Sequence, residues 1–250
     1  MVSCNLFGRY GNQLFQVSAT IAYALKYNMQ YSIPKHGLNF GQKTNYIFPN
    51  QTDIKPQFTY TQPNHGYNEI PYFDNVTLNG HFQCEKYFEG FKNEIREILE
   101  FPEATINKCA IHVRRGDYLL QYNRFPVLPI EYYDNGIGLM FKNGIKEFVV
   151  FSDDTEWCRT AFMYGMSHCF PNSELYLNVS FLLHNSGNDI EDLKHMSEYR
   201  YMIIANSSYS LFASLINEKE YVIAPKHESW FGKGVNLKTS DLLPERFIQI

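Results

Sequence analysis

The stretch Cys109-Ala110-Ile111-His112-Val113 decides the fold, because it is a nearly continuous apolar run with the length of one buried strand. Similar runs follow at residues 148–151, 201–205 and 221–224, and polar residues come after them. Segments with helical spacing lie between the runs. Strands that are apolar on both faces and alternate with helices are typical of a largely parallel sheet. The sequence therefore predicts an α/β fold.

The N-terminal region shows the same alternation on a smaller scale. Residues 2–7 predict a short strand, and residues 8–11 predict a turn punctuated by glycine. Apolar residues then recur at spacings of three and four, as on one face of a helix: Leu14, Val17, Ile21 and Leu25. The first unit is thus expected to be a strand, a tight turn and a helix.

A division of the chain is predicted near Glu103. Residues 35–72 show no sustained period and are expected to form irregular connections with short elements. Helical spacing returns from Phe88 to Phe101, and Pro102 ends it. We therefore expect an N-terminal half over residues 1–103 and a C-terminal half over residues 104–250. In the second half, Asp189 is the expected N-cap of a helix.

Composition narrows the classes of function. The 250 residues are 44% hydrophobic and 16% aromatic, which is enough to bury a substantial core. A net charge of −4 makes a nucleic-acid partner unexpected, because such partners require a basic surface. Crossing a bilayer takes about 18 to 20 apolar residues, and no run is that long. The expectation is a cytoplasmic protein, or one without its anchor, and a peripheral membrane contact is compatible with it.

Cysteine and histidine usage predicts no metal site. The five cysteines are odd in number and form no C-x-x-C pair, so reduced and packed thiols are expected. No H-x-x-x-H or H-E-x-x-H pattern occurs. The histidines outside the polar clusters are expected to be solvated or locally satisfied: His36, His65, His168, His184, His195 and His227.

The most informative polar cluster directly follows the strand at residues 109–113. Strand alternation places His112 and Arg114 on the same side, and Gly116 permits a tight turn. Two adjacent guanidinium groups fit a diphosphate, and they can stabilise a departing nucleoside diphosphate without a metal. The alternative is a structural ion pair with Asp117.

Residues 8–13, Gly-Arg-Tyr-Gly-Asn-Gln, form a second cluster between the first strand and the first helix. Free amides at a helix start and close approach at glycine make a site for an anion or a sugar. An ordinary tight turn is the alternative. The segment lacks both the G-x-G-x-x-G spacing and the Walker lysine, so neither a dinucleotide fold nor a P-loop is supported.

Two further clusters follow later strands. Ser152, Asp153 and Asp154 could receive ribose hydroxyls, accept from base N–H groups or hold a divalent cation, and the alternative is a helix N-cap. The segment Asn206-Ser207-Ser208-Tyr209-Ser210 leaves a strand and opens a helix, so its amides and hydroxyls can take a phosphate. Capping is again the alternative.

In combination and order, these clusters resemble the motif series of family 11 glycosyltransferases. The resemblance spans residues 5 to 230 approximately, and its segments are Gly8–Gln16, Gly80–Gln83 with Tyr87 and Phe88, His112–Tyr118, Phe151–Asp154 with Trp157, and Ile204–Ser210. The family contains α-1,2-fucosyltransferases, and the H-x-R-R-G-D segment is its most specific mark.

The resemblance implies a fold and a reaction. The fold would be GT-B-like, with two Rossmann-type halves and largely parallel sheets. The reaction would be an inverting, metal-independent transfer of L-fucose from GDP-fucose to a sugar hydroxyl, α-1,2 to galactose, with no cofactor. The N-terminal half would hold the glycan acceptor and the C-terminal half the donor. The alternatives are a transferase of another nucleotide sugar and a noncatalytic module that binds sugar nucleotides or glycans.

The resemblance also implies roles for individual residues. Arg114 with His112 would contact the donor phosphates, and Asp117 is the candidate general base. The remaining donor-binding candidates are Arg115, Ser152, Asp153, Asp154, Asn206, Ser207 and Ser208. The candidates that face the fucose or the acceptor are Arg9, Tyr10 and Asn12. Leu211-Phe212 departs from the family's usual aromatic pair, which bears on acceptor preference.

Overall fold

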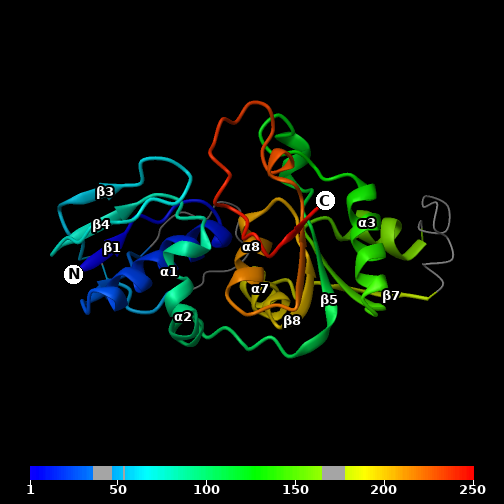
Figure 1. Cartoon of the computed structure of the whole chain (residues 1–250), viewed down its shortest axis with the longest axis horizontal. Helices are drawn as coiled ribbons and strands as arrows, with labels where there is room; N and C mark the ends of the chain where they lie inside the picture. Colours follow the sequence, from blue (N-terminus) through cyan, green and yellow to red (C-terminus); the bar gives the residue numbers. More distant parts are fainter. Residues whose placement is uncertain (36–46, 53, 165–177) are drawn as a thin grey trace.

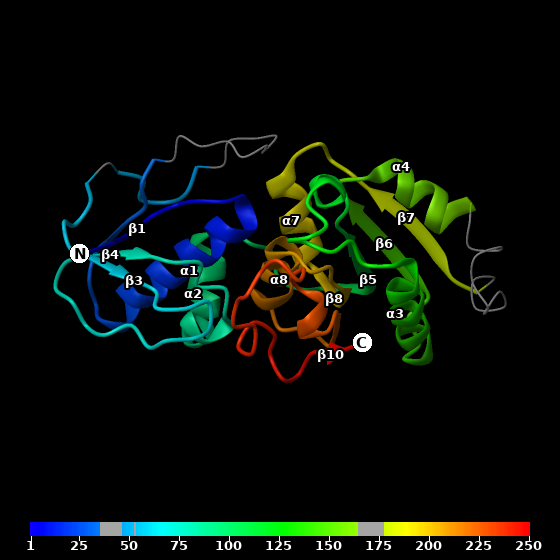
Figure 2. The same cartoon turned by 90° about the horizontal axis from the view of Figure 1, so that it is seen from above.

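Two all-parallel sheets organise the computed structural model, which describes the chain except for residues 36–46, 53 and 165–177. Figure 1 shows the smaller sheet at the N-terminal side of the molecule and the larger one at the other side. Figure 2 shows the same separation from above. The predicted α/β class with largely parallel sheets is confirmed.

The smaller sheet has the strand order β2-β1-β4-β3. Its elements are β1 (Val2–Cys4), α1 (Tyr10–Lys26), β2 (Tyr31–Ser32), β3 (Thr59–Thr61) and β4 (Val76–Asn79). In α1 the predicted apolar face is buried at Leu14, Val17 and Ile21, while Leu25 is exposed. Other sides of α1 are buried too, because the helix packs against the smaller sheet on one side and against the C-terminal part of the chain on another.

The larger sheet has the strand order β10-β9-β8-β5-β6-β7. Its strands are β5 (Ile106–Val113), β6 (Glu147–Ser152), β7 (Ser180–His184), β8 (Tyr199–Ile203), β9 (Tyr221–Ala224) and β10 (Ile248–Gln249). Cys109 pairs with Phe148 on one side and with Tyr201 on the other, so the predicted apolar runs lie next to each other. The central position of β5 explains why its second half is buried on both faces.

The helices of the C-terminal part connect these strands. They are α3 (Ile130–Lys142), α4 (Thr155–Cys158), α7 (Asp189–Ser197) and α8 (Ser208–Leu215). Shorter helical turns lie at η1 (Glu85–Tyr87), η2 (Glu89–Phe91), η3 (Asp117–Leu120), the π-helical η4 (Arg159–Tyr164) and η5 (His227–Ser229). Asn188, not Asp189, is the N-cap of α7, since its side chain accepts from the amides of Ile190 and Glu191.

The predicted helix from Phe88 to Phe101 is shorter than expected. It consists of η2 followed by α2 (Lys92–Ile98), because Phe91 leaves helical backbone angles at φ −133°. The helix ends before Glu100, whose φ is +56°. Four strands, β2, β4, β7 and β10, were not predicted, and β3 lies in the region expected to hold only short elements. Runs of two to five partly polar residues carry too little periodicity to separate a strand from a loop.

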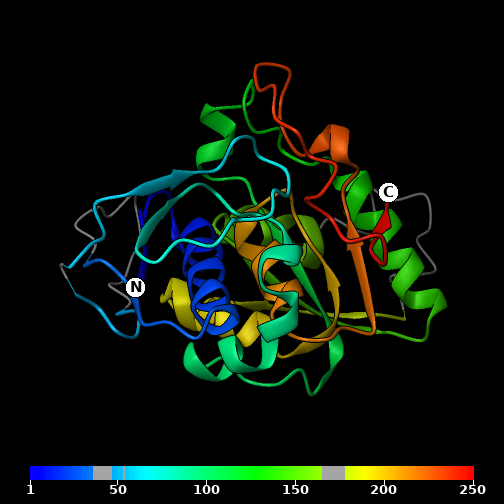
Figure 3. The same ribbon diagram turned by 60° about the vertical axis from the view of Figure 1, so that its left-hand side comes forward.

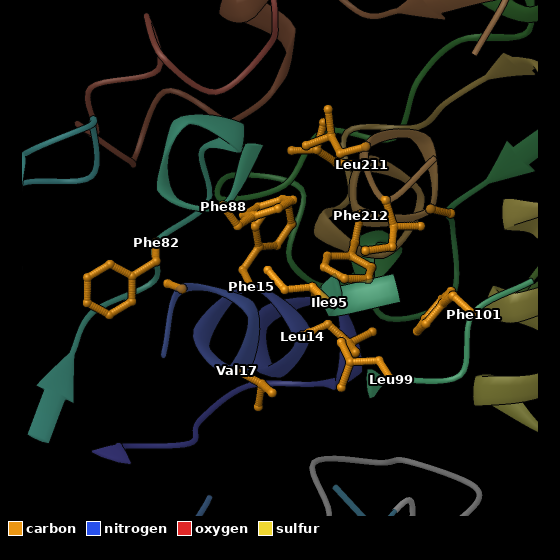
Figure 4. Packing of buried hydrophobic residues seen from close by; sticks show 14 of the residues in the cluster. Leu14, Phe15, Val17, Phe82, Phe88, Ile95, Leu99, Phe101, Leu211 and Phe212 are labelled. Carbon is orange, nitrogen blue, oxygen red and sulfur yellow. The ribbon is translucent and has the colours of Figure 1, made fainter. Parts of the chain in front are cut away.

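A shared apolar core joins the two sheets through α1 and α8. Figure 4 shows Phe15 and Phe88 from the N-terminal part facing Phe212 on α8. The ring centroids of Phe15 and Phe212 are 5.4 Å apart, with an edge-to-face angle of 84°. Phe101 contacts Phe212 from another side, at 5.6 Å. This packing fixes the N-terminus of α1 against that of α8.

The C-terminal segment also ties the two parts together. After β9 it crosses to the N-terminal part, where the two terminal guanidinium nitrogens of Arg246 donate to the Glu85 carboxylate, at 2.6 and 2.5 Å. Lys86 pairs with Asp241 at 2.9 Å. The segment, red in Figure 1, then returns to the larger sheet as β10. The division near Glu103 remains our proposal, because the last residues contact both parts.

Candidate active site

A cavity of about 490 Å³ lies between the two parts, and residues from both line it. Most of the predicted site residues lie in its wall: Arg9, Tyr10, Asn12, His112, Arg114, Asp117, Ser152, Asp153, Asn206, Ser207 and Ser208. They lie at or after the carboxyl ends of β1, β5, β6 and β8, where parallel sheets bind their ligands. The motifs separated along the chain are thus brought to one place.

The N-termini of α1 and α8 meet at this cavity. A Cβ atom on Gly11 would lie 2.5 Å from the Tyr209 amide nitrogen, so only glycine permits this approach. Asn12 links the two helices, because its Oδ1 accepts from Gln83 Nε2 at 2.6 Å and from Ser208 Oγ at 2.7 Å. The positive ends of both helix dipoles make this wall suited to an anion.

Arg114 is held in the cavity wall by two carboxylates. One guanidinium nitrogen contacts Asp153 at 3.0 Å and the other contacts Asp117 at 2.5 Å. The guanidinium also lies 5.2 Å from the centre of the Tyr118 ring. The predicted alternative of an ion pair with Asp117 is therefore present, and it lies within the cavity. It orients Arg114 toward the space where a ligand would bind.

Asp117 connects the two parts of the molecule. Besides Arg114, it contacts Arg9 of the N-terminal part at 3.4 Å. Each carboxylate oxygen therefore faces a guanidinium group. To act as a general base, Asp117 would have to release one of these contacts.

His112 lies buried behind Arg114. Its Nδ1 is 2.8 Å from Ser210 Oγ, and its ring lies 5.4 Å from that of Tyr209. Burial, together with the nearby Arg114 charge, lowers the pKa of His112 to about 3. The imidazole is therefore neutral near pH 7, and it can supply a hydrogen bond but no positive charge to a phosphate.

Arg115 and Asp154 do not line the cavity. Consecutive residues leave a strand on opposite sides, so Arg115 points away from Arg114. Its Nε contacts Asp154 at 3.1 Å, and its guanidinium lies 4.1 Å from the centre of the Trp157 ring. Asp154 also accepts from the Trp157 amide at 3.1 Å. Asp154 is thus a helix N-cap, which was the alternative to a ligand-binding role.

The serines and Asn206 stand at two strand ends. Ser207 is the N-cap of α8, and Ser152 Oγ accepts from the Asp154 amide at 2.9 Å. The Asn206 side-chain nitrogen donates to the Pro126 and Trp230 carbonyls, at 2.9 and 3.2 Å. Its buried Oδ1 has no partner within the described residues. That oxygen can accept from a ligand in the cavity.

Two histidines of the cavity wall were not predicted as site residues. His65 was expected to be solvated or locally satisfied, and it does hydrogen-bond with Gln83 and the Lys238 backbone. It is buried, however, and lines the cavity beside His81. The two rings are 5.3 Å apart. Burial lowers the pKa of His65, and burial with the neighbouring ring lowers that of His81 to about 4. Both imidazoles are therefore neutral near pH 7. In the sequence, only the motif segment Gly80–Gln83 pointed to His81, and no motif pointed to His65.

The remaining sequence predictions concern thiols, other histidines and the membrane. Cys4, Cys84, Cys109 and Cys158 are free and buried, as expected. His184 contacts Asp192 at 3.0 Å and His195 contacts Glu198 at 2.9 Å, so both are locally satisfied. Cys169, His36 and His168 lie outside the described residues. Over the described ranges, no helix is long and apolar enough to cross a bilayer.

Comparison with known proteins identifies the family. The profile described as Glycosyl transferase family 11 matches residues 91–233, which is more than half of the chain. The chain belongs to glycosyltransferase family 11. The matched range includes the H-x-R-R-G-D segment and the clusters after β6 and β8, whereas residues 1–90 lie outside it. The family match therefore covers the polar clusters that follow β5, β6 and β8.

Two curated relatives come from Escherichia coli. An alpha-1,2-colitosyltransferase is 30% identical over 195 residues, covering 70% of this chain and 63% of that protein. The O-antigen biosynthesis glycosyltransferase WbnK is 28% identical over 184 residues, covering 68% of this chain and 57% of its own length. The chain thus spans less than two thirds of the length of either relative.

Solved fucosyltransferase structures show a weaker likeness. A NodZ alpha-1,6-fucosyltransferase soaked with GDP-fucose aligns over 91% of this chain and 95% of its own, with a TM-score of 0.47 and 11% identity. POFUT1 in complex with GDP aligns over 86% of this chain and 93% of its own, with a TM-score of 0.42 and 12% identity.

Proposed function

We propose that this family 11 glycosyltransferase moves L-fucose from GDP-fucose to a sugar hydroxyl, α-1,2 to galactose, with inversion at the anomeric carbon. The observation that carries the proposal is the convergence of Arg114 and two helix N-termini on one cavity between the halves. That wall suits a diphosphate, and the space beside it is bordered by the N-terminal half. The H-x-R-R-G-D segment supports a GDP-linked donor.

In this reaction the bond between fucose C1 and the β-phosphate oxygen breaks, and the acceptor oxygen bonds to C1. Negative charge then grows on the leaving GDP. Arg114 is fixed by Asp117 and Asp153 before the reaction, so it can stabilise that charge without reorganisation. Ser207, Ser208 and the amides of α8 would bind the phosphates, and neutral His112 would add one hydrogen bond.

We propose that the reaction needs no metal. The acidic pair after β6 is the only predicted ligand set for a cation, and arginines already contact both of its members. Asp153 contacts Arg114 at 3.0 Å, and Asp154 contacts Arg115 at 3.1 Å. The charge on GDP would be offset by Arg114 and the two helix termini instead.

The acceptor would enter from the N-terminal half. Arg9, Tyr10 and Asn12 line that side, together with His65 and His81. The neutral imidazoles can hydrogen-bond to sugar hydroxyls, and they are alternatives to Asp117 as acceptors of the hydroxyl proton. The general base is therefore to be sought in this group.

A second donor sugar is favoured by one observation. The relative at 30% identity is named for colitosyl transfer, so colitose is the alternative to fucose at the same site.

The experiment is a donor panel of GDP-fucose, GDP-colitose, GDP-mannose and UDP-galactose, with release of the nucleotide as the readout. We expect turnover with GDP-fucose and little with the last two. Turnover with UDP-galactose alone would refute the GDP assignment, and GDP binding without turnover of any donor would indicate a noncatalytic module.

A further inference from the structure

Two neighbouring loops beside the cavity expose apolar side chains. We call residues 118–125 and 231–238 the rim. Within it the exposed fraction is 50% for Leu119, 87% for Leu120 and 68% for Tyr122. Leu237, in the second loop, is 41% exposed. Large apolar side chains that gather on a surface mark an interaction site, whereas scattered ones do not.

Backbone contacts hold the two loops of the rim together. The Gly232 amide donates to the Arg124 carbonyl at 2.9 Å, and the Gly234 amide donates to the Asn123 carbonyl at 3.2 Å. A Cβ atom on Gly232 would lie 2.2 Å from the Asn123 oxygen, so a side chain there would separate the loops. Figures 1 and 3 both show the green turn and the orange-red loop side by side at the top.

The rim forms one border of the cavity. Arg124, Phe125 and Leu237 lie in the cavity wall, whereas Leu119, Leu120 and Tyr122 do not. The same loops thus have an inner side toward the ligand space and an outer side toward solvent. Whatever covers the outer side therefore lies next to the cavity wall.

The charge of the rim is opposite to that of the chain. Its two segments contain Arg124, Lys233 and Lys238 and no acidic residue, although the chain carries a net charge of −4. Lys238 contacts Asp241 at 3.3 Å. Among the described residues, no carboxylate lies within ion-pair distance of Arg124 or Lys233. Apolar side chains with free cations beside them suit the interface of an anionic bilayer.

We propose that the rim docks the protein on an anionic membrane surface. Leu119, Leu120 and Tyr122 would enter the headgroup region. Lys233 would contact anionic lipid, as would Arg124, which is exposed although it borders the cavity. Docking follows from the exposed rim itself, so it stands even if the donor sugar of the proposed function is wrong.

The experiment is co-sedimentation of the full chain with vesicles. One set contains phosphatidylcholine alone and the other also contains phosphatidylglycerol. We expect binding to the mixed vesicles, weakened by high salt, because the attraction is partly electrostatic. Leu120→Ser should lower the affinity about tenfold or more, since that side chain leaves water on docking.

Leu182→Ser is the matched control. Leu182 is 61% exposed on the edge strand β7, outside the rim, and its replacement should leave vesicle binding unchanged. GDP-dependent melting shifts should be the same in both variants and the parent chain, which shows that each is folded. Equal binding of the parent and Leu120→Ser, or no binding to mixed vesicles, would overturn the proposal. A dimer in light scattering that Leu120→Ser dissociates would assign the rim to a second copy instead.

Discussion

Replacement of Arg114 by lysine tests whether the guanidinium acts on the leaving phosphate. In the structure its two terminal nitrogens contact different carboxylates, Asp153 and Asp117, while the group lines the cavity. Lysine keeps the charge but has a single nitrogen, so it cannot hold both contacts and face a phosphate as well. The charge would remain near the site without its fixed position.

The expected loss is in turnover. Removal of one preorganised donor that stabilises developing charge typically costs about 10² to 10³ in kcat, which is about 2.7 to 4 kcal/mol. We expect Arg114→Lys to lower kcat by about 10² and to change GDP affinity less. One ion pair is lost at a mostly buried position, so the free energy of unfolding should fall by about 1 kcal/mol. For a chain of this size, a loss of about 1 kcal/mol lowers Tm by about 2 to 4 °C.

Arg115→Lys is the matched control, since it makes the same chemical change one residue away. Arg115 contacts Asp154 and the Trp157 ring and does not line the cavity. Its replacement should cost a similar amount of stability but little kcat. The assay is GDP release from GDP-fucose at saturating donor, with melting curves for each variant. Equal losses of kcat in both variants, or near-normal kcat in Arg114→Lys, would refute the assigned role.

Four further predictions follow from the cavity and its surroundings. GDP at a hundred times its Kd should stabilise the fold by about 2.7 kcal/mol, and equal melting shifts from UDP in full titrations would contradict the guanine assignment. Excess EDTA should leave transfer unchanged, whereas loss of activity that manganese restores would defeat the metal-free reaction. Gly11→Ala should lower Tm, because its Cβ would lie 2.5 Å from the Tyr209 amide. Gly90→Ala, with nothing within 4 Å, is its control and should have little effect. The free energy of unfolding should fall as the pH decreases below about 6.5. In the folded chain the pKa of His112 is about 3 and that of His81 is about 4, so below about pH 6.5 the unfolded chain binds more protons than the folded one. Urea titrations between pH 7 and 5 would show no such slope if these imidazoles were solvated.

The four inner strands of the larger sheet, β5, β6, β8 and β9, were predictable because they are largely buried, whereas the partly exposed edge strands β7 and β10 were not predicted. Residues 109–113 and 148–151 are near-continuous apolar runs, and they pair directly in the structure. The smaller sheet was predicted only in part. β4 and β3 have four and three residues, and their partners lie far away in sequence, so local patterns could not show the pairing. The N-cap of α7 differed by one residue because Asn188 and Asp189 are both good caps.

The site was predictable where polar residues directly follow a buried strand. Arg114 and Ser208 lie in one cavity because parallel strands end at the same edge. Arg115 was grouped with Arg114 by its position in sequence, although the alternation of a strand sends the two apart. His65 comes from a segment without periodicity, and the path that brings it beside His81 is set by tertiary packing alone.

The most direct test of the central claim is transfer from GDP-fucose labelled in the sugar to a panel of galactose-terminated glycans. The account predicts labelled glycan and free GDP in equal amounts, with the new fucose in α-1,2 linkage to galactose. Folded protein that binds GDP yet transfers no label would contradict the claim, as would transfer from UDP-linked sugars only.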